Sequence, residues 1–512
     1  MWNYNLGLEF NTISKKYPTN TAFIIENKSY TYEKVNFDST NCAGKLQNLG
    51  LKLGDRVCIT SKKQYETFVS FLACLKLGVT YSFVDRHTPI ERYKNIINIL
   101  KPSLIICDFI LEKTAKEADP KIPRLELSEI NIQTNQVSYN FENHVRAIPS
   151  NTIAYIMFTS GSTGVPNGVA VTHRNVIEFR NWGVNEYKIT DNERITNLNS
   201  LFFDNSVFDL YMSLFTGATI IPFERDDLKD PNQIVSAVEK TNATIWFSVP
   251  SLIIYLLNFR SITKTSFPNL KKIIFGGEGF AKNKLHELYQ FIGDRIDIVN
   301  VYGPTEGTCI CSSYKISERD FSNKNMKVLA PLGHIAPNFN YIILDKNNTL
   351  VTNGTIGELC IGGENISKGY YGNPQKTKEK FIQNPNNQHY IEIIYKTGDL
   401  VKIDESGFLN FCGRTDSQIK FMGYRIELGE IETALSSFHE IKESVVLFGE
   451  RNSVQEITCF LCTDLNKNTL KQELEKILPT YMIPRKFVYM NILPKNSNGK
   501  IDRKKLKEEY YD

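Results

Sequence analysis

The stretch Thr159-Ser-Gly-Ser-Thr-Gly-Val-Pro-Asn-Gly168 directly follows an apolar run, Ile153-Ala-Tyr-Ile-Met-Phe158. Glycines after a strand let the backbone approach a ligand closely, and successive N–H groups in such a turn form an anion-binding concavity. The stretch therefore predicts a phosphate-binding loop, with a flexible polar loop as the alternative. It does not match the G-x-x-x-x-G-K-[ST] loop of many kinases and ATPases, which weighs against that class.

On both sides of this loop, short β-branched runs alternate with longer amphipathic segments. We expect helices at Tyr65–Leu77 and at 91–100, and strands at Arg56–Thr60, Leu104–Cys107, 153–157 and 244–247. Strand–helix alternation of this kind predicts parallel sheets in an α/β fold.

The pattern of predicted helices and strands changes twice towards the C-terminus. From 329 to 411, short strands separated by Gly, Asn and Asp turns predict a small β-rich subdomain. After Gly413, helical patterns at 431–438 and 470–478 flank strand patterns at 444–448 and 457–461. This predicts a compact α+β tail of about 100 residues, which is a plausible domain size.

Composition excludes several classes of protein. The chain has 512 residues, of which 41% are hydrophobic and 23% charged, and these values are typical of a globular protein. Its formal net charge of +4 is low for a nucleic-acid binder, so we expect no nucleic-acid partner. The N-terminus shows no signal-peptide pattern, and the longest apolar runs are too short to span a bilayer.

The cysteines favour a reducing compartment. All 10 are scattered along the chain, as expected for a cytoplasmic protein without a disulfide framework. Cys459 and Cys462 have metal-like spacing, but they fall in an expected buried strand and no second pair completes a site. We therefore expect them to be structural.

The phosphate loop resembles the core signature of the adenylate-forming (acyl-CoA synthetase-like) superfamily. It is closest to adenylation domains of nonribosomal peptide synthesis and to D-alanine–carrier protein ligases. The resemblance runs from about Tyr30 to Arg503. The further matching segments, in order, are Phe203-Asp-Asn-Ser206, Gly276-Gly-Glu278, Asn300-Val-Tyr-Gly-Pro-Thr-Glu306, Gly357-Glu-Leu-Cys-Ile-Gly-Gly363, Tyr395-Lys-Thr-Gly-Asp399, Gly413-Arg-Thr-Asp-Ser-Gln-Ile-Lys420, Gly423-Tyr-Arg-Ile-Glu-Leu-Gly-Glu-Ile-Glu432 and Asn498-Gly-Lys-Ile-Asp502.

The resemblance implies the architecture of that superfamily. It implies a large N-terminal core over 1–412, built of two α/β subdomains and the β-rich subdomain. A hinge at 413–416, centred on Asp416, would connect it to a mobile α+β domain at 417–512. After adenylation the small domain would rotate and present Lys420 and Gly423-Tyr424 to an incoming thiol.

The resemblance also implies ATP and Mg2+ and assigns their residues. Lys500 would bridge the substrate carboxylate, the ribose and the α-phosphate, Glu306 would bind magnesium, and Thr305 would lie with them as a catalytic residue. Tyr302 would stack on adenine beside Asn300, and Asp399 and Arg414 would contact the ribose. The remaining nucleotide-binding residues would be Thr159, Ser160, Gly161, Ser162, Thr163, Gly164, Gly277, Glu278 and Gly303.

Asp204 carries the information about substrate class. In family members that activate amino acids, an aspartate here pairs with the α-ammonium group, and a buried carboxylate needs such a cation. The substrate pocket that the resemblance implies has a mostly apolar lining without a second charge, which predicts a neutral, aliphatic amino acid. Apolar walls distinguish two substrates that differ by one methylene by only about 1–3 kcal/mol. The lining would be Asn205, Phe208, Phe247, Ile274, Gly276, Val301, Cys309 and Ile310.

One position departs from the family pattern. The loop normally ends Pro-Lys-Gly, but here it ends Pro166-Asn167-Gly168. Asn can donate a hydrogen bond, but the charge-assisted contact with a β- or γ-phosphate is lost. We expect weaker ATP binding or pyrophosphate handling in an enzyme that remains active.

The implied reaction is ATP-dependent formation of an aminoacyl-AMP with release of pyrophosphate. Transfer to the phosphopantetheine thiol of a carrier protein would follow. The sequence shows no carrier segment, so we expect the carrier to act in trans, whether the chain is free-standing or excised from a larger synthetase. The alternatives are a D-alanine–carrier protein ligase, an acyl- or aryl-CoA ligase and a non-catalytic nucleotide-binding homologue. No membrane partner is expected.

Overall fold

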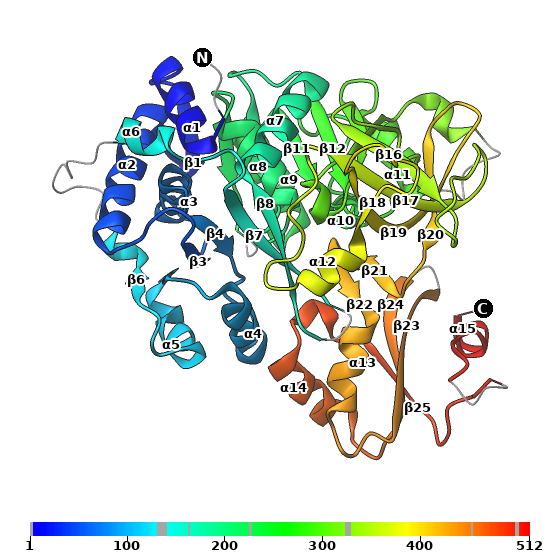
Figure 1. Cartoon of the computed structure of the whole chain (residues 1–512). Helices are drawn as coiled ribbons and strands as arrows, with labels where there is room; N and C mark the ends of the chain where they lie inside the picture. Colours follow the sequence, from blue (N-terminus) through cyan, green and yellow to red (C-terminus); the bar gives the residue numbers. More distant parts are fainter. Residues whose placement is uncertain are drawn as a thin grey trace.

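The computed structural model describes residues 4–130, 141–161, 164–224, 228–322, 329–451, 454–496 and 501–511. It confirms the mixed α/β class, with a large N-terminal part and a smaller C-terminal part (Figure 1). Within the described ranges, no helix is both long and apolar enough to cross a membrane.

The phosphate loop belongs to a six-stranded sheet of order β6-β5-β3-β4-β7-β8. The sheet is parallel except for β8, which pairs antiparallel with β7. The expected strands at 56–60 and 104–107 are confirmed. The strands are β3 (Arg56–Thr60), β4 (Thr80–Phe83), β5 (Leu104–Cys107), β6 (Arg124–Glu126), β7 (Ile153–Thr159) and β8 (Asn167–Thr172).

A second sheet has nine strands, in the order β15-β14-β13-β12-β11-β9-β10-β1-β2. Its central strands are parallel, and its outer strands β2, β14 and β15 pair antiparallel with their neighbours. The strands are β1 (Thr21–Ile25), β2 (Lys28–Thr31), β9 (Arg194–Asn197), β10 (Thr219–Pro222), β11 (Ile245–Ser248), β12 (Lys272–Gly276), β13 (Asp297–Tyr302), β14 (Ser312–Lys315) and β15 (His334–Ile335).

Helices cover both faces of these sheets, which explains the continuous apolar strands. On β11, Phe247 faces the core between the two sheets, whereas the adjacent Trp246 faces the outer helices. The helices of this part are α1 (Leu6–Lys16), α2 (Tyr32–Asn48), α3 (Tyr65–Leu77), α4 (Ile90–Leu100), α5 (Phe109–Ala118), α6 (Phe141–Arg146), α7 (His173–Tyr187), α8 (Asn205–Leu214), α9 (Pro231–Lys240), α10 (Pro250–Asn258) and α11 (Lys282–Ile292).

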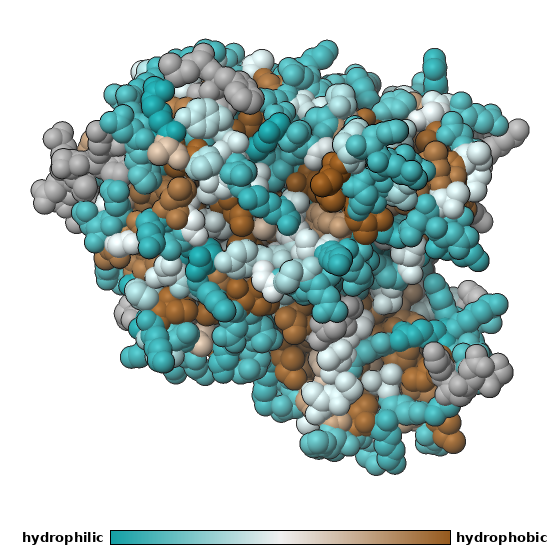
Figure 2. All heavy atoms as spheres, viewed as in Figure 1, coloured by the Kyte–Doolittle hydropathy of each residue, from teal (hydrophilic) through white to brown (hydrophobic). Residues whose placement is uncertain are grey.

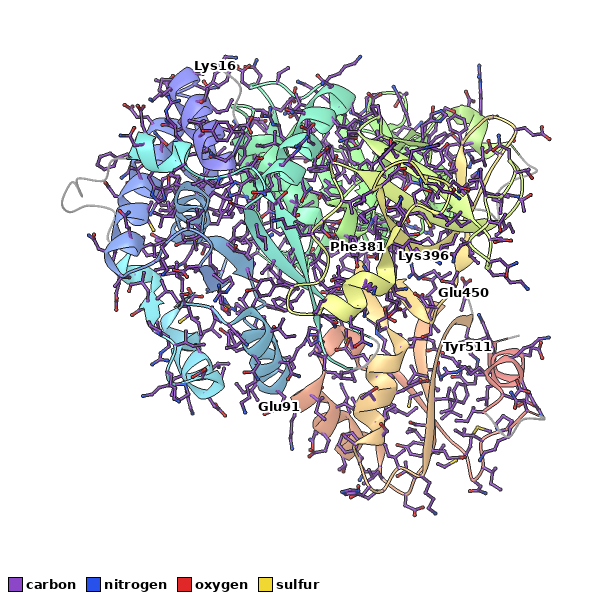
Figure 3. The ribbon with its side chains drawn as sticks, in the orientation of Figure 1. Lys16, Glu91, Phe381, Lys396, Glu450 and Tyr511 are labelled. Atoms are coloured by element: carbon purple, nitrogen blue, oxygen red, sulfur yellow. The ribbon has the colours of Figure 1, made fainter. Side chains whose placement is uncertain are left out.

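The expected β-rich subdomain is a five-stranded antiparallel sheet with one short helix. Its path is β16-β17-β19-β18, and β20 also pairs with β19. In Figure 3, Phe381 of β18 and Lys396 of β19 locate this sheet above the small C-terminal part. The elements are β16 (Phe339–Leu344), β17 (Gly357–Gly363), α12 (Pro374–Lys380), β18 (Phe381–Gln383), β19 (Ile393–Ile403) and β20 (Leu409–Arg414).

The C-terminal part begins with a hairpin and continues into a three-stranded sheet of order β23-β24-β25. Helices α13 and α14 pack on one face of that sheet, and α15 packs on the other. The elements are β21 (Gln418–Phe421), β22 (Tyr424–Glu427), α13 (Leu428–Ser436), β23 (Glu443–Arg451), β24 (Val454–Cys462), α14 (Lys467–Ile477), β25 (Lys486–Tyr489) and α15 (Arg503–Tyr511).

The cysteine pair on β24 illustrates the alternation of a strand. Cys459 packs with α13 and α14, whereas Cys462 packs in the cluster of α15. Because residues three apart point to opposite faces, the two thiols do not converge. Among the described residues no group of His, Cys, Asp and Glu side chains could hold a metal ion.

The hydrophilic residues of the chain gather on the surface of both parts. Figure 2 shows them over most of the visible face, with apolar residues in scattered areas. The buried apolar residues form several separate cores, among them two in the N-terminal part and one beneath α13 and α14.

Candidate active site

The phosphate loop is the turn between β7 and β8. Thr159 pairs with Asn167 and Phe158 pairs with Gly168, so the loop is held at both ends by a ladder. A Cβ on Gly161 would lie 2.0 Å from the Val165 carbonyl oxygen, so only glycine fits there. Ser162 and Thr163 lie outside the described residues, whereas Gly164 adopts a left-handed φ of 79°.

Asn167 braces this loop from inside. Its side chain is 8% exposed, and its Nδ2 donates to the Ser160 carbonyl oxygen at 3.1 Å. The amide therefore stabilises the turn through a neutral hydrogen bond. It brings no positive charge to the phosphate loop, as the sequence indicated.

Glu306 lies at the centre of the site. It is fully buried in the short turn after β13, and Tyr370 donates to its Oε1 at 2.7 Å. Nη1 of Arg425 donates to both carboxylate oxygens at 3.1 and 2.9 Å. Burial opposes ionisation of this carboxyl, but the charge of Arg425 and the hydrogen bonds to the carboxylate together outweigh burial and lower the pKa of Glu306.

The residues assigned to ribose and adenine also converge. Tyr302 donates to Asp399 Oδ2 at 2.6 Å, and Arg414 forms an ion pair with Oδ1 of the same carboxylate. Lys420 Nζ lies 5.2 Å from the centre of the Tyr302 ring. Asn300, in contrast, is buried and donates to the Pro331 carbonyl oxygen. Burial lowers the pKa of Lys420.

Asp204 is placed beside this cluster. It precedes α8, and its Oδ2 accepts a hydrogen bond of 2.6 Å from Thr305. Removal of the carboxylate from water raises the pKa of Asp204. An ionised Asp204 therefore gains from a nearby cation such as an ammonium group.

The apolar residues assigned to the substrate side chain pack together in the core between the sheets. Phe208 and Phe247 form an edge-to-face pair with ring centres 4.8 Å apart. A Cβ on Gly276 would lie 2.6 Å from Cγ2 and from the carbonyl oxygen of Val301, so Val301 fills the space beside this glycine. Cys309 has a φ of 77°, which is uncommon for a residue with a side chain. The set that belongs to this core is Phe208, Phe247, Ile274, Val301, Cys309 and Ile310.

A cavity opens next to Asn205. This cavity of about 430 Å3 lies between the large part and the loop Met422-Gly423-Tyr424 of the small part. Gly423 donates to Glu278 Oε2 at 2.9 Å, and Ser251 donates to Oε1 of the same carboxylate at 2.6 Å. Glu278, expected at the nucleotide, thus also ties the small part to the rim of this cavity.

Lys500 lies outside the described residues. Its neighbours in sequence attach to the small part, since Lys495 forms an ion pair with Glu443 of β23 and Arg503 forms one with Glu432 of α13. In Figure 3, Tyr511 at the end of α15 lies across the small sheet from α4, which carries Glu91.

Three charged residues at the site were not predicted from the sequence. Arg425 and Glu430 lie inside a quoted family segment, but nothing in the sequence indicated their partners. Arg92 of α4 forms an ion pair with Glu430, and Glu430 also accepts a hydrogen bond from Gly161 N. No sequence signal pointed to Arg92, because a charged residue near the start of a helix is ordinary.

A fourth missed residue is Asp209, one helical turn after Asn205. Its Oδ2 accepts from Asn197 and Asn199 at 2.8 and 3.0 Å, and Asn199 also donates to the Phe247 carbonyl oxygen. Burial raises the pKa of Asp209 to about 7. The network fixes the end of β11 at Phe247, one of the residues expected to line the pocket for the substrate side chain.

Two family models match the chain. Residues 10–371 match the AMP-binding enzyme family, and residues 430–500 match the AMP-binding enzyme C-terminal domain. The chain belongs to the AMP-binding enzyme family.

Curated relatives of this AMP-binding enzyme are similar over nearly its whole length. It is 32% identical over 509 residues to the D-alanine–D-alanyl carrier protein ligase of Lactococcus lactis, covering 97% of both chains. It is 33% identical over 506 residues to bacitracin synthase 1 of Bacillus licheniformis, covering 98% of the chain. The match spans only 9% of the length of that synthase.

Solved structures share the fold of this AMP-binding enzyme. An artificially fused adenylation–PCP di-domain from Klebsiella oxytoca has a TM-score of 0.83 at 24% identity, covering 94% of this chain and 93% of that chain. The o-succinylbenzoate CoA synthetase of Bacillus subtilis has a TM-score of 0.85 at 20% identity, covering 98% of both chains.

Proposed function

We propose that this AMP-binding enzyme activates a neutral, aliphatic amino acid with ATP and transfers it to the phosphopantetheine thiol of a carrier protein in trans. The observation that carries the proposal is the hydrogen bond between Asp204 and Thr305. It places a carboxylate suited to an α-ammonium group beside the segment that holds Tyr302 and Glu306.

The chemistry has two steps. A carboxylate oxygen of the amino acid attacks the α-phosphorus of ATP, the bond to the bridging oxygen of the β-phosphate breaks, and pyrophosphate leaves. The carrier thiolate then attacks the carbonyl carbon of the aminoacyl-AMP, and AMP leaves. The first step brings two anions together, so fixed cations and oriented donors are its main requirement. We assign Lys500 to this role, with its compact charge on a flexible stem.

Nucleotide binding is assigned to the cluster around Asp399. Asp399 and Arg414 would hold the ribose hydroxyls, and Tyr302 would stack on adenine. The phosphate loop would cradle the phosphates with its N–H groups and hydroxyls.

Magnesium is assigned to Glu306. Mg2+ is commonly held by one or two carboxylates together with substrate phosphates, so a single buried carboxylate with a tyrosine partner fits it. When bound, Mg2+ would neutralise charge on the phosphates. Arg425 has to leave Glu306 first, because it donates to both oxygens.

The acceptor is assigned to the cavity of about 430 Å3 beside Gly423. It has the size of small-molecule sites in general, and it borders Asn205 at the substrate pocket. We propose that Met422, Gly423 and Tyr424 form its wall during transfer. The small domain at 417–512 would reach this position by rotation about Asp416, within the hinge 413–416.

The substrate class rests on the absence of charge among the lining residues described above. A charged side chain buried there would be unpaired, which costs far more than burying an aliphatic group. D-Alanine is the second candidate, because the D-alanine–D-alanyl carrier protein ligase is similar over 97% of both chains. An acyl- or aryl-CoA ligase would not need Asp204.

The test is amino-acid-dependent exchange of pyrophosphate into ATP. A screen would include L- and D-amino acids, fatty acids and aromatic acids, followed by mass spectrometry of a phosphopantetheinylated carrier. We expect exchange with a small set of neutral amino acids, loss of exchange in Lys500→Ala and a higher KM for the amino acid in Asp204→Ala. A signal with fatty or aromatic acids only contradicts the substrate proposal, and no exchange with any substrate favours the non-catalytic homologue.

A further inference from the structure

One carboxylate of the small part occupies an anion site built by the large part. Glu430 of α13 forms an ion pair with Arg92 of α4, and its Oε2 accepts a hydrogen bond of 3.2 Å from Gly161 N. The side chains of Glu430 and Arg92 are 2% and 8% exposed. A carboxylate here lies against a backbone N–H of the phosphate loop and against a guanidinium.

Both groups that hold the carboxylate belong to the large part. Gly161 is fixed by its close approach to Val165, and Arg92 precedes Tyr93, which packs in the core against the six-stranded sheet. The Tyr93 hydroxyl also lies 3.2 Å from Thr60 Oγ1. Arg92 and Gly161 N are therefore expected to keep their places when the small part rotates away with Glu430.

The phosphate loop lacks the lysine usual in its family, and its Asn167 brings no charge. Arg92 lines the same small cavity as Thr159 and Ser160. Among the described residues, the other cations of that cavity are committed elsewhere: Arg414 pairs with Asp399, and Lys420 and Arg425 lie beyond the hinge. Arg92 is thus suited to supply the positive charge that position 167 lacks.

We propose that Arg92 and Gly161 N bind a β- or γ-phosphate oxygen of ATP, or pyrophosphate, and that Glu430 takes this place when the small domain faces the acceptor. The inference rests on the proposed function and adds a phosphate-binding residue to it. Two anions cannot share one guanidinium and one N–H at this distance, because like charges repel strongly in a buried site. Polyphosphate and the acceptor-facing orientation therefore exclude each other.

The competition gives the two steps an order. Glu430 enters only after pyrophosphate has left, so the cavity for the thiol forms around Gly423 once the first product is gone. AMP lacks the β- and γ-phosphates, so the aminoacyl-AMP does not compete with Glu430. Arg92 acts here as a phosphate-binding residue and Glu430 as a positioning residue.

The test measures nucleotide binding directly, with ATP, pyrophosphate and AMP as probes in calorimetric titrations of the full chain. Glu430→Gln removes the competing charge and keeps the shape, so we expect ATP and pyrophosphate to bind several-fold more tightly. In the Glu430→Gln background, Arg92→Met should lower the affinities for ATP and for pyrophosphate by about tenfold or more, which is the usual effect of losing a charge-assisted contact. AMP affinity should stay unchanged throughout.

The matched control is Lys94→Met on the same helix, which removes an exposed charge paired with Glu91. Arg92→Lys retains the charge and should recover part of the ATP affinity, which separates binding from folding. Equal ATP affinity of Glu430→Gln with and without Arg92→Met overturns the proposal, and so does an equal loss for AMP. These titrations need no amino acid, so they remain decisive even if the exchange screen fails.

Discussion

Arg425 and Glu306 form an ion pair across the boundary between the small and the large part, with nitrogen–oxygen distances of 3.1 and 2.9 Å. The pair joins β22 to the turn after β13. Together with the bond from Gly423 to Glu278 and the pair of Arg92 with Glu430, it closes the small part over the site. In this arrangement, Gly423 of the small part lines the cavity proposed for the acceptor.

Replacement of Arg425 by methionine should slow transfer to the carrier by about tenfold, or about 1.4 kcal/mol, because Glu306 is left buried without its cation in the acceptor-facing orientation. Pyrophosphate exchange should change much less, since Glu306 then meets magnesium instead. Single-turnover assays of the two steps measure the difference. A larger loss in exchange than in transfer contradicts this prediction, and Arg425→Lys serves as the conservative variant.

Replacement of Asp416 by proline should block thioester formation and spare adenylation. Asp416 accepts from Arg414 Nε at 2.7 Å and from Gln418 N at 3.2 Å, and proline fixes φ at a position that has to rotate. The measurements are pyrophosphate exchange and carrier loading. Asp416→Ala is the control, because it removes the hydrogen bonds of the side chain but leaves the backbone at 416 free to rotate. An equal loss of both steps in the proline variant would count against a hinge here.

Binding of the amino acid should weaken as the pH falls. Burial raises the pKa of Asp204, and only the ionised carboxylate attracts an ammonium group. Acidification through this raised pKa therefore protonates Asp204 and lowers kcat/KM for the amino acid. In Asp204→Asn, kcat/KM should be about a hundredfold lower at every pH. A pH profile of pyrophosphate exchange measures this, and the same acid limb in Asp204→Asn would assign it to another group.

Replacement of Gly276 by alanine should raise the KM for the amino acid and leave the KM for ATP unchanged. The new methyl group would lie 2.6 Å from Val301 Cγ2 and from its carbonyl oxygen, so the wall of the pocket has to shift. Overpacking of this kind costs about 1–3 kcal/mol, which thermal unfolding should detect. An unchanged melting temperature together with an unchanged KM would show that the wall yields freely.

The fold class follows from local patterns that the tertiary structure leaves intact. The strands at 56–60 and 104–107 and the helix at 65–77 are found as expected, because apolar periodicity reports burial directly. The ends of some elements differ from the expected ones. For example, α13 begins at Leu428 and not at 431. The glycines indicated the phosphate loop, because the tight turn leaves no space for a side chain at Gly161.

Pairings between distant charges could not be predicted in this way. Arg92 and Glu430 are separated by 338 positions, and Arg425 and Glu306 by 119. Each of these residues has an ordinary setting in the sequence, and their meeting depends on how two domains dock. The same holds for Asp209, which no sequence pattern singled out and which is buried with Asn197 and Asn199.

The sequence by itself indicated the α/β class, the phosphate loop and the missing lysine at Asn167, because these depend on residue type and on spacing along the chain. The other candidate site residues came from the resemblance to a family. Only the tertiary structure decided which charges face one another. It placed the carboxylate of Glu430 against Gly161 N and Arg92, where a phosphate could bind. Electrostatic pairing depends on distance in space, and in this protein that distance is set by how the large and the small part pack against each other.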